Sequence, residues 1–232
     1  MSKGNILLVE DDPSLGFVTR DNLQVEGYNV HLEVHGRQAL DAFENQAFDL
    51  CLLDIMLPGR DGFELAWEIR SKDEFVPIIF LTARNMDEDR WKGFEIGGDD
   101  YITKPFSIKE LLYKIAVFIR RSRKPQKTTS MLSVGTYTFD LENLKLSHES
   151  MTTALTQMEG ELLKMLAESQ GQLVKREEIL INIWGENDYF KGRSLDVFIS
   201  RLRKYLSLDE ALTIKNHHGV GFSLMNTKSN FS

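Results

Sequence analysis

The sequence predicts two domains of different fold class, a doubly wound α/β domain followed by an α+β domain. The first 122 residues alternate short apolar segments with amphipathic helical patterns, whereas the remainder begins with loosely alternating segments and then turns helical. The net charge also divides there, because residues 1–122 carry −8 and residues 123–232 carry +1 of the total of −7. Such an asymmetry indicates domains with different partners.

The boundary between the domains falls in a basic segment that contains no acid. Residues 120–130 hold five Lys or Arg side chains, Pro125 and a Thr-Thr-Ser tail. This composition is typical of a helix end followed by a solvated linker. We therefore predict domains at residues 1–122 and 131–232, joined by a linker at residues 123–130.

Composition argues against a membrane protein and against a disulfide framework. The longest apolar runs, such as residues 78–81, are far shorter than the roughly 20 residues that a membrane span requires. The polar residues 1–5 lead directly into an apolar strand pattern, without a signal region. Cys51 is the single cysteine and fits a core position in a reducing compartment. We expect a soluble cytoplasmic protein with no membrane partner.

The first domain has five apolar segments that alternate with helical patterns. The predicted strands cover residues 6–9, 30–34, 50–54, 78–82 and 101–103, and the predicted helices cover residues 14–26, 36–45, 62–71, 87–96 and 107–121. Nearly continuous Ile, Leu, Val and Phe in three of the strands indicates burial on both faces. Five such units in about 120 residues predict a doubly wound, five-stranded parallel sheet.

Polar side chains gather at the predicted carboxyl ends of these strands, where doubly wound sheets bind ligands. In chain order they are Glu10, Asp11, Asp12, Asp54, Thr82 and Lys104. Crowded carboxylates repel one another unless a cation joins them, and a ligand set made only of oxygen suits Mg²⁺. A carboxylate beside Mg²⁺ can accept a phosphoryl group, with the hydroxyl and the ammonium as donors to its oxygens. Asp12 precedes Pro13 and fits a helix cap better than a ligand.

Four segments in this order carry a resemblance to a known family, namely residues 8–12 (LVEDD), 53–59 (LDIMLPG), 81–84 (LTAR) and 99–106 (DDYITKPF). Through them residues 1–122 resemble the receiver domain of response regulators, which has a flavodoxin-like fold. The resemblance implies that Asp54 is the phosphoryl acceptor and that Thr82 and Lys104 bind the phosphoryl oxygens. The implied Mg²⁺ ligands are Glu10, Asp11, Asp54 and the backbone carbonyl of Met56. Tyr101 would be an aromatic switch that turns inward when Thr82 moves, and the bond before Pro105 would be cis.

The same resemblance implies a charged output surface that pairs across a two-fold axis in phosphorylated OmpR/PhoB proteins. The residues at these positions are Arg90, Glu95, Asp99, Asp100, Glu110, Lys114 and Arg121. Ala116 stands where a Lys is common, so one ion pair of the network would be missing. The alternative is a solvated face with intramolecular pairs, because exposed pairs contribute only about 0–1 kcal/mol each.

The sequence of the second domain predicts short antiparallel strands at residues 131–148, followed by three helices and a terminal hairpin. Thr156 caps the first helix, and Gly171 follows its end. The second helix covers residues 176–184 and the third about 194–206, and the hairpin pairs residues 212–215 with 219–224. This order is typical of a winged helix-turn-helix domain.

The third helix divides into an apolar and a polar face. Leu195, Ile199, Leu202 and Leu206 form a core stripe. The opposite face carries Arg193, Ser194, Val197, Ser200, Arg201 and Lys204. Such a face can enter the major groove of double-stranded DNA. Taken alone, the pattern slightly favours an ordinary amphipathic helix with a solvated basic face.

Residues 132–225 resemble the effector domain of OmpR/PhoB transcription factors in the segments 155–163, 176–185, 193–204 and 219–222. The resemblance implies that Val197 and Arg201 read bases, with Ser194 and Lys204 nearby. The residues that would contact phosphates are Arg176, Trp184, Arg193 and Arg203. Phe198 and Ser200 replace residues that are often His and Arg in the family. His217 and His218 stand where an Arg often enters the minor groove, so we expect a His218 contact that strengthens below about pH 6.5.

These inferences together predict a DNA-binding response regulator of a two-component system, which a sensor histidine kinase phosphorylates on Asp54. It would form a homodimer on phosphorylation and bind tandem DNA half-sites, with RNA polymerase a further partner at residues 186–192. We expect that the protein is not an enzyme that turns over external substrates, although it would assist its own phosphorylation and dephosphorylation. Two alternatives are a hydrolase that uses Asp54 on external substrates and a module that binds only proteins.

Overall fold

The computed structural model describes residues 2–59, 61–83, 98–122, 131–169, 171–185 and 189–227. Backbone contacts divide the chain into two compact units, Met1–Lys124 and Pro125–Ser232, which we call the N-terminal unit and the C-terminal unit. The predicted linker at residues 123–130 lies outside the described residues. Within the described ranges, every helix is too short or too polar to cross a membrane.

The N-terminal unit contains the predicted five-stranded parallel sheet. Its strands are β1 (Asn5–Val9), β2 (Asn29–Glu33), β3 (Leu50–Asp54), β4 (Ile78–Ala83) and β5 (Asp100–Lys104). They are ordered β2-β1-β3-β4-β5, and every pairing is parallel. This is the flavodoxin-like order, and its switch point lies between β1 and β3. The central strand β3 is buried at all five positions, as its unbroken apolar sequence predicts.

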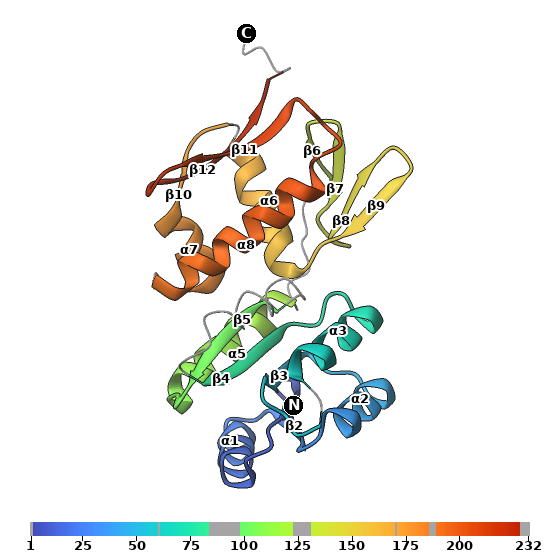
Figure 1. Cartoon of the computed structure of the whole chain (residues 1–232), viewed down its shortest axis with the longest axis vertical. Helices are drawn as coiled ribbons and strands as arrows, with labels where there is room; N and C mark the ends of the chain where they lie inside the picture. The colour runs from blue at the N-terminus through green and yellow to red at the C-terminus, as the bar shows by residue number, and fades with distance from the viewer. Residues whose placement is uncertain are drawn as a thin grey trace. The chain divides into compact units, whose positions relative to one another are not determined.

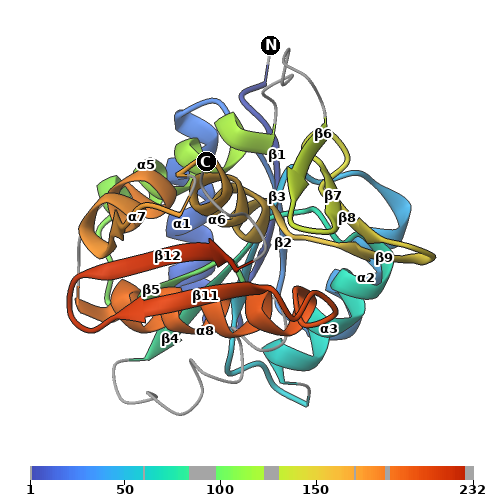
Figure 2. The ribbon, with the colours of Figure 1, turned by 90° about the horizontal axis from the view of Figure 1, so that it is seen from above.

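Helices cover both faces of this sheet. The described helices are α1 (Pro13–Val25), α2 (Gly36–Asn45), α3 (Gly62–Lys72) and α5 (Ile108–Ser122). Helix α1 packs with α5, and α2 packs with α3 on the opposite face (Figure 2). Each lies within two residues of its predicted range, while the helix predicted at residues 87–96 is outside the described residues. Gly62 is required where α3 begins, because a Cβ there would lie 2.1 Å from the backbone oxygen of Asp54.

The C-terminal unit begins with a four-stranded antiparallel sheet. Its strands are β6 (Met131–Val134), β7 (Tyr137–Asp140), β8 (Lys145–His148) and β9 (Met151–Ala154), in sequence order. The alternating pattern predicts the first three but not β9. That strand lies at the sheet edge with two exposed and two half-buried residues, so no apolar alternation marks it.

Three helices and a terminal hairpin complete the C-terminal unit (Figure 1). The helices are α6 (Gln157–Glu168), α7 (Arg176–Trp184) and α8 (Tyr189–Tyr205), and the hairpin pairs β11 (Leu212–His217) with β12 (Gly221–Asn226). Strand β10 (Val174–Lys175) adds a third strand against β12. The predicted core stripe on α8, which includes Leu195 and Leu202, is buried. The winged helix-turn-helix prediction is therefore confirmed, although α8 begins five residues earlier than predicted, because Gly192 weakens the helical signal there.

Candidate phosphoacceptor site and nucleic-acid interface

Three carboxylates converge at the carboxyl ends of β1 and β3. Glu10 and Asp11 follow β1, and Asp54 is the last residue of β3. Because these strands are parallel neighbours, their ends lie side by side, and one carboxylate oxygen from each residue lies within 4.8 Å of the others. Glu10 and Asp54 are buried, whereas Asp11 is exposed. The structure therefore brings together the three acidic side chains that the sequence assigns to a metal site.

Lys104, the last residue of β5, reaches the same cluster. Its Nζ lies 2.6 Å from Oδ2 of Asp54 and 2.7 Å from each carboxylate oxygen of Glu10. The peptide bond between Lys104 and Pro105 is cis, as the resemblance implies. One ammonium group thus faces two buried carboxylates, and the site keeps a net negative charge.

Burial and pairing act in opposite directions on the two partners Glu10 and Lys104. Burial raises the pKa of Glu10, and the contact with Lys104 only partly offsets it. Burial disfavours the charged form of Lys104, but hydrogen bonds and attraction from Asp54 and Glu10 together outweigh it, so the pKa of Lys104 is raised. The ammonium therefore stays charged at neutral pH, while part of the carboxylate charge lacks a counterion.

One carboxylate oxygen of the cluster lies close to the Lys104 ammonium but makes no hydrogen bond. Oε2 of Glu10 is buried and has no hydrogen-bond donor of suitable geometry within the described part of the chain. The backbone N–H of Met56 donates to Oδ1 of Asp54 at 3.0 Å, so the loop that carries the Met56 carbonyl folds against this carboxylate. A partly unsatisfied, all-oxygen set of donors fits a hard divalent cation.

Asp12 belongs to a helix terminus rather than to the cluster. Its carboxylate accepts hydrogen bonds from the backbone N–H groups of Ser14 at 2.8 Å and Leu15 at 3.0 Å. Asp12 is the N-cap of α1, and Pro13 occupies the first turn. The interpretation of Asp12 as a cap is confirmed, and its carboxylate satisfies donors that would otherwise be unpaired.

The predicted switch residues Thr82 and Tyr101 lie on the neighbouring strands β4 and β5. Thr82 is buried near the end of β4 and pairs in register with Thr103. The ring of Tyr101 is also buried and stacks on Phe80, with 5.2 Å between ring centroids. Tyr101 is thus turned inward in this structure.

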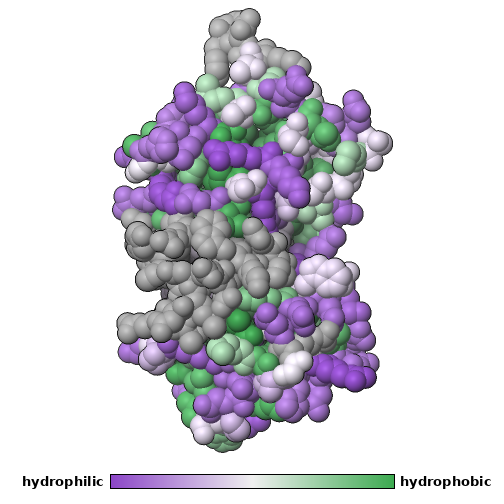
Figure 3. All heavy atoms as spheres, viewed as in Figure 1, coloured by the Kyte–Doolittle hydropathy of each residue, from purple (hydrophilic) through white to green (hydrophobic). Residues whose placement is uncertain are grey.

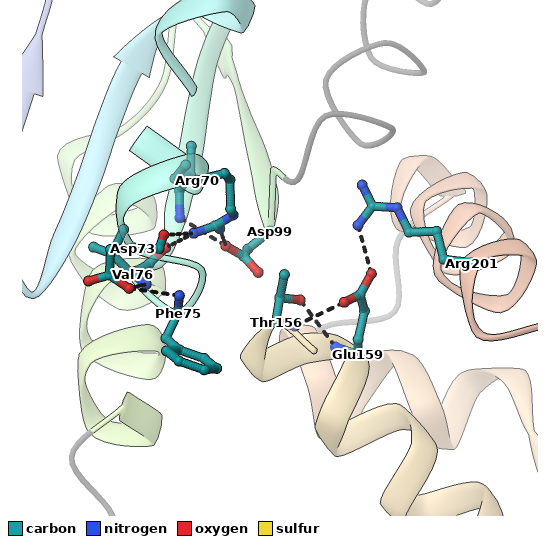
Figure 4. A network of polar contacts seen from close by, with 9 residues as sticks. Arg70, Asp73, Phe75, Val76, Asp99, Thr156, Glu159 and Arg201 are labelled. Carbon is teal, nitrogen blue, oxygen red and sulfur yellow. Dashed lines mark hydrogen bonds and ion pairs between the residues drawn. The ribbon is translucent and has the colours of Figure 1, made fainter. Parts of the chain in front are cut away.

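The predicted dimer face is not a continuous exposed surface. Asp99 pairs with Arg70 at 2.6 Å (Figure 4). It also accepts the backbone N–H of Ile78 at 2.9 Å. Asp100 pairs with Lys114 at 2.7 Å, and both side chains are buried. The family resemblance implies that Asp99, Asp100 and Lys114 lie on one outward face. The structure corrects that expectation, because Asp99 and Asp100 pair inside the unit with Arg70 of α3 and Lys114 of α5. Glu110 is exposed, whereas Arg90, Glu95 and the side chain of Arg121 lie outside the described residues.

In the C-terminal unit, three predicted DNA contacts are engaged by partners of their own domain. Arg176 makes a two-bond ion pair with Asp196 of α8, at 2.8 and 2.9 Å. Arg201 pairs with Glu159 of α6 at 2.8 Å. Arg203 donates to the backbone oxygen of Ile214 in β11. The sequence marks Glu159 only through the capping pattern with Thr156, and nothing in it links Glu159 to Arg201.

The remaining predicted contacts differ in exposure. Lys204 and His218 are exposed, and the side chain of Arg193 is outside the described residues. The residues Trp184, Ser194 and Val197 are buried. The ring centroids of Trp184 and Phe198 lie 5.6 Å apart, so Trp184 packs against another side chain of its own domain. The face of the C-terminal unit seen in Figure 3 is mostly hydrophilic, with scattered hydrophobic side chains.

Comparison with known families matches both units. Residues 6–116 match the response regulator receiver domain, and residues 150–224 match the C-terminal domain of transcriptional regulatory proteins. The chain is 43% identical over 224 residues to the transcriptional regulatory protein RprY of Bacteroides fragilis, covering 96% of this chain and 95% of that protein. It is 36% identical to the phosphate regulon regulator PhoB of Rhizobium meliloti, covering 94% and 97%. The chain belongs to the OmpR/PhoB family of response regulators.

Solved structures agree with this assignment. The response regulator DrrB of Thermotoga maritima, an OmpR/PhoB homologue, is 30% identical and aligns over 97% of this chain and 100% of its own, with a TM-score of 0.53. A RitR mutant aligns over 96% and 99% at 25% identity, with a TM-score of 0.74. This response regulator is therefore a DNA-binding regulator of transcription in a two-component system. A receiver domain implies a histidine kinase as partner.

Proposed function

We propose that Asp54 accepts a phosphoryl group from a sensor histidine kinase and that the phosphorylated chain binds DNA as a dimer. The observation that carries the proposal is the buried Asp54 carboxylate, with Lys104 at 2.6 Å and two further carboxylates within 4.8 Å. A buried carboxylate beside a fixed cation is poised to attack an electrophilic phosphorus. In that step a carboxylate oxygen bonds to phosphorus while the bond from phosphorus to the kinase histidine breaks, and its electron pair stays on the imidazole nitrogen.

The residues around Asp54 then have defined roles. Glu10, Asp11, Asp54 and the Met56 carbonyl would hold Mg²⁺. When bound, the ion reduces repulsion between the carboxylates and the incoming phosphoryl group. Lys104 donates to a phosphoryl oxygen, and the Thr82 hydroxyl donates to another. Thr82 is buried on β4, next to the strand β5 that carries Tyr101. This position supports a switch in which a movement of Thr82 on phosphorylation changes the position of the Tyr101 ring.

This chemistry serves a switch rather than turnover on external substrates. Aspartyl-phosphate hydrolases usually carry a second Asp two residues beyond the nucleophile, and Met56 occupies that position in this chain. Met56 has no group that can protonate a leaving oxygen, so we assign only assistance in self-phosphorylation and self-dephosphorylation.

Phosphorylation would change the preferred partners of the charged residues predicted at the dimer face, three of which (Asp99, Asp100 and Lys114) are buried in this structure. The buried pairs of Asp99 with Arg70 and of Asp100 with Lys114 are intramolecular alternatives to pairs across a two-fold axis. A receiver dimer raises the effective concentration of two winged helices on tandem half-sites. Contacts of residues 186–192 with RNA polymerase complete the proposal.

The phosphoacceptor is tested by the intact mass of the chain after incubation with acetyl phosphate and Mg²⁺. Wild type should gain one phosphoryl group, and Asp54→Asn should gain none. Omission of Mg²⁺ should abolish the adduct on wild type. An adduct of equal yield on Asp54→Asn would contradict the assignment. If wild type shows no adduct, a stable complex with beryllofluoride separates rapid hydrolysis from a site that takes no phosphoryl group.

A further inference from the structure

Glu159 is held rigidly at the start of α6. Its Oε2 accepts the backbone N–H of Thr156 at 2.9 Å, and the Thr156 hydroxyl accepts the backbone N–H of Glu159 at 3.4 Å. This reciprocal pair is a capping box, and the Glu159 side chain is only 1% exposed. The carboxylate therefore has one orientation, fixed by the backbone of α6.

The other oxygen of this carboxylate faces α8. Oε1 accepts a hydrogen bond from Nη1 of Arg201 at 2.8 Å (Figure 4). The Tyr205 hydroxyl donates to the same oxygen at 3.4 Å. The Arg201 guanidinium also lies 5.7 Å from the ring centroid of Phe198. The Glu159 carboxylate and the Phe198 ring thus fix the direction of Arg201 on the predicted recognition helix, and the Tyr205 hydroxyl holds the carboxylate oxygen that Arg201 contacts.

This pair differs from the second arginine pair of the domain. Arg176 and Asp196 are 27% and 47% exposed, so a DNA phosphate can replace Asp196 as the partner of Arg176, and water can solvate the released carboxylate, at low cost. Arg201 is 14% exposed, and withdrawal of its charge would leave the Glu159 carboxylate buried without a cation. The cost of an unpaired buried carboxylate exceeds the gain from one base contact. Arg201 therefore has no favourable route to DNA that abandons Glu159.

A guanidinium group has enough donors to keep both partners. It carries five N–H groups in a planar fork, and the bond to Glu159 uses an N–H on Nη1. We propose that Glu159 is a positioning residue for DNA recognition, which aims Arg201 at its base through an ion pair that persists in the DNA complex. This inference rests on the proposed function, in which Arg201 contacts a base.

The test compares Glu159→Gln with a matched control, Thr156→Ala. Gln keeps an oxygen for the Thr156 N–H but loses the ionic bond to Arg201, whereas Thr156→Ala weakens the same helix cap and leaves the ion pair intact. The probes are duplexes that phosphorylated wild type selects from a randomised 30-base-pair pool, and scrambled duplexes of equal composition. The measured quantity is the ratio of the two affinities at fixed salt.

Glu159→Gln should lower this specificity ratio about tenfold, within the range that one bidentate base contact contributes. Thr156→Ala should leave it unchanged. Arg201→Ala should lower it at least as much, and Glu159→Gln should then have no additional effect in the Arg201→Ala background. A wild-type ratio in Glu159→Gln, or an undiminished effect in the double variant, would overturn the proposal.

Two further outcomes separate this inference from the proposed function. If wild type selects no sequence and binds both duplexes equally, the proposed role of Arg201 in base reading fails first. If Glu159→Gln does not fold, nitrogen-15 spectra of wild type decide the matter. The Arg201 guanidinium signal, identified by its absence in Arg201→Ala, should show restricted rotation both free and on the selected duplex. Free rotation in the complex would show that the ion pair is lost.

Discussion

The buried pair between Arg70 and Asp99 gives a quantitative prediction about the N-terminal unit. Oδ2 of Asp99 accepts hydrogen bonds from Arg70 at 2.6 Å and from the backbone N–H of Ile78 at 2.9 Å. The side chain of Arg70 is 11% exposed and that of Asp99 is 3% exposed. Asp99→Ala leaves a largely buried guanidinium without its counterion and a strand N–H without its acceptor. Such a loss costs about 3–5 kcal/mol. We expect about 3 kcal/mol, because Arg70 keeps the carbonyls of Asp73 and Val76 as acceptors.

Hydrogen exchange measured by mass spectrometry on the β4 segment reports this loss in the full chain. The strand is buried from Ile78 to Leu81, so its amides exchange only when the unit opens. A loss of about 3 kcal/mol accelerates that exchange by about a hundredfold. The control is Lys72→Ala, which breaks a pair with Glu44 whose partners are 41% and 45% exposed. Its effect should stay below about 1 kcal/mol. Exchange in Asp99→Ala as slow as in the control would show that the buried pair of Asp99 with Arg70 does not contribute this stability.

Three further predictions concern the other sites. Gly62→Ala should destabilise the N-terminal unit by about 1–3 kcal/mol, since a Cβ would lie 2.1 Å from the backbone oxygen of Asp54; an unchanged urea midpoint would contradict this. Lys104→Met should slow phosphorylation of Asp54 by acetyl phosphate about a hundredfold, because Nζ lies 2.6 Å from Oδ2; intact-mass time courses measure the rate, and a wild-type rate would count against the role. Burial and the Glu159 carboxylate raise the pKa of Tyr205 from 10.0 to about 12, so the stability that this tyrosine contributes is complete below pH 10 and is lost as pH rises toward 12. The ultraviolet phenolate difference between wild type and Tyr205→Phe should therefore titrate near 12, and a midpoint near 10 would exclude the buried contact.

The geometry of the candidate phosphoacceptor site was predictable because it follows from the fold. Once alternating strands and helices indicate a parallel sheet, the ends of neighbouring strands must lie together, and Glu10, Asp54 and Lys104 sit at those ends. The helix at residues 36–45 and the strand at residues 50–54 agree with their predicted bounds, because a helical periodicity marks the first and an unbroken apolar run marks the second.

Short edge strands and ion-pair partners were not predictable in this way. Strand β10 has two residues, and its pairing with β12 depends on Gly221, where a Cβ would lie 2.0 Å from the backbone oxygen of Val174. Asp99 and Asp100 follow two glycines, a context that suggests a solvated loop. Their burial depends on basic side chains brought from α3 and α5 by the tertiary fold. The sequence shows that Asp99 and Asp100 are charged, but it does not show which basic side chains pair with them.

In the proposed function, a phosphoryl group on Asp54 controls DNA binding by the C-terminal unit. The most direct measurement is the affinity of the full chain for its selected duplex, with and without acetyl phosphate and Mg²⁺, in wild type and Asp54→Asn. Phosphorylation should tighten binding by wild type, Asp54→Asn should not respond, and the affinity of both should fall steeply with added salt. Equal affinity of phosphorylated and unphosphorylated wild type would contradict the proposed function.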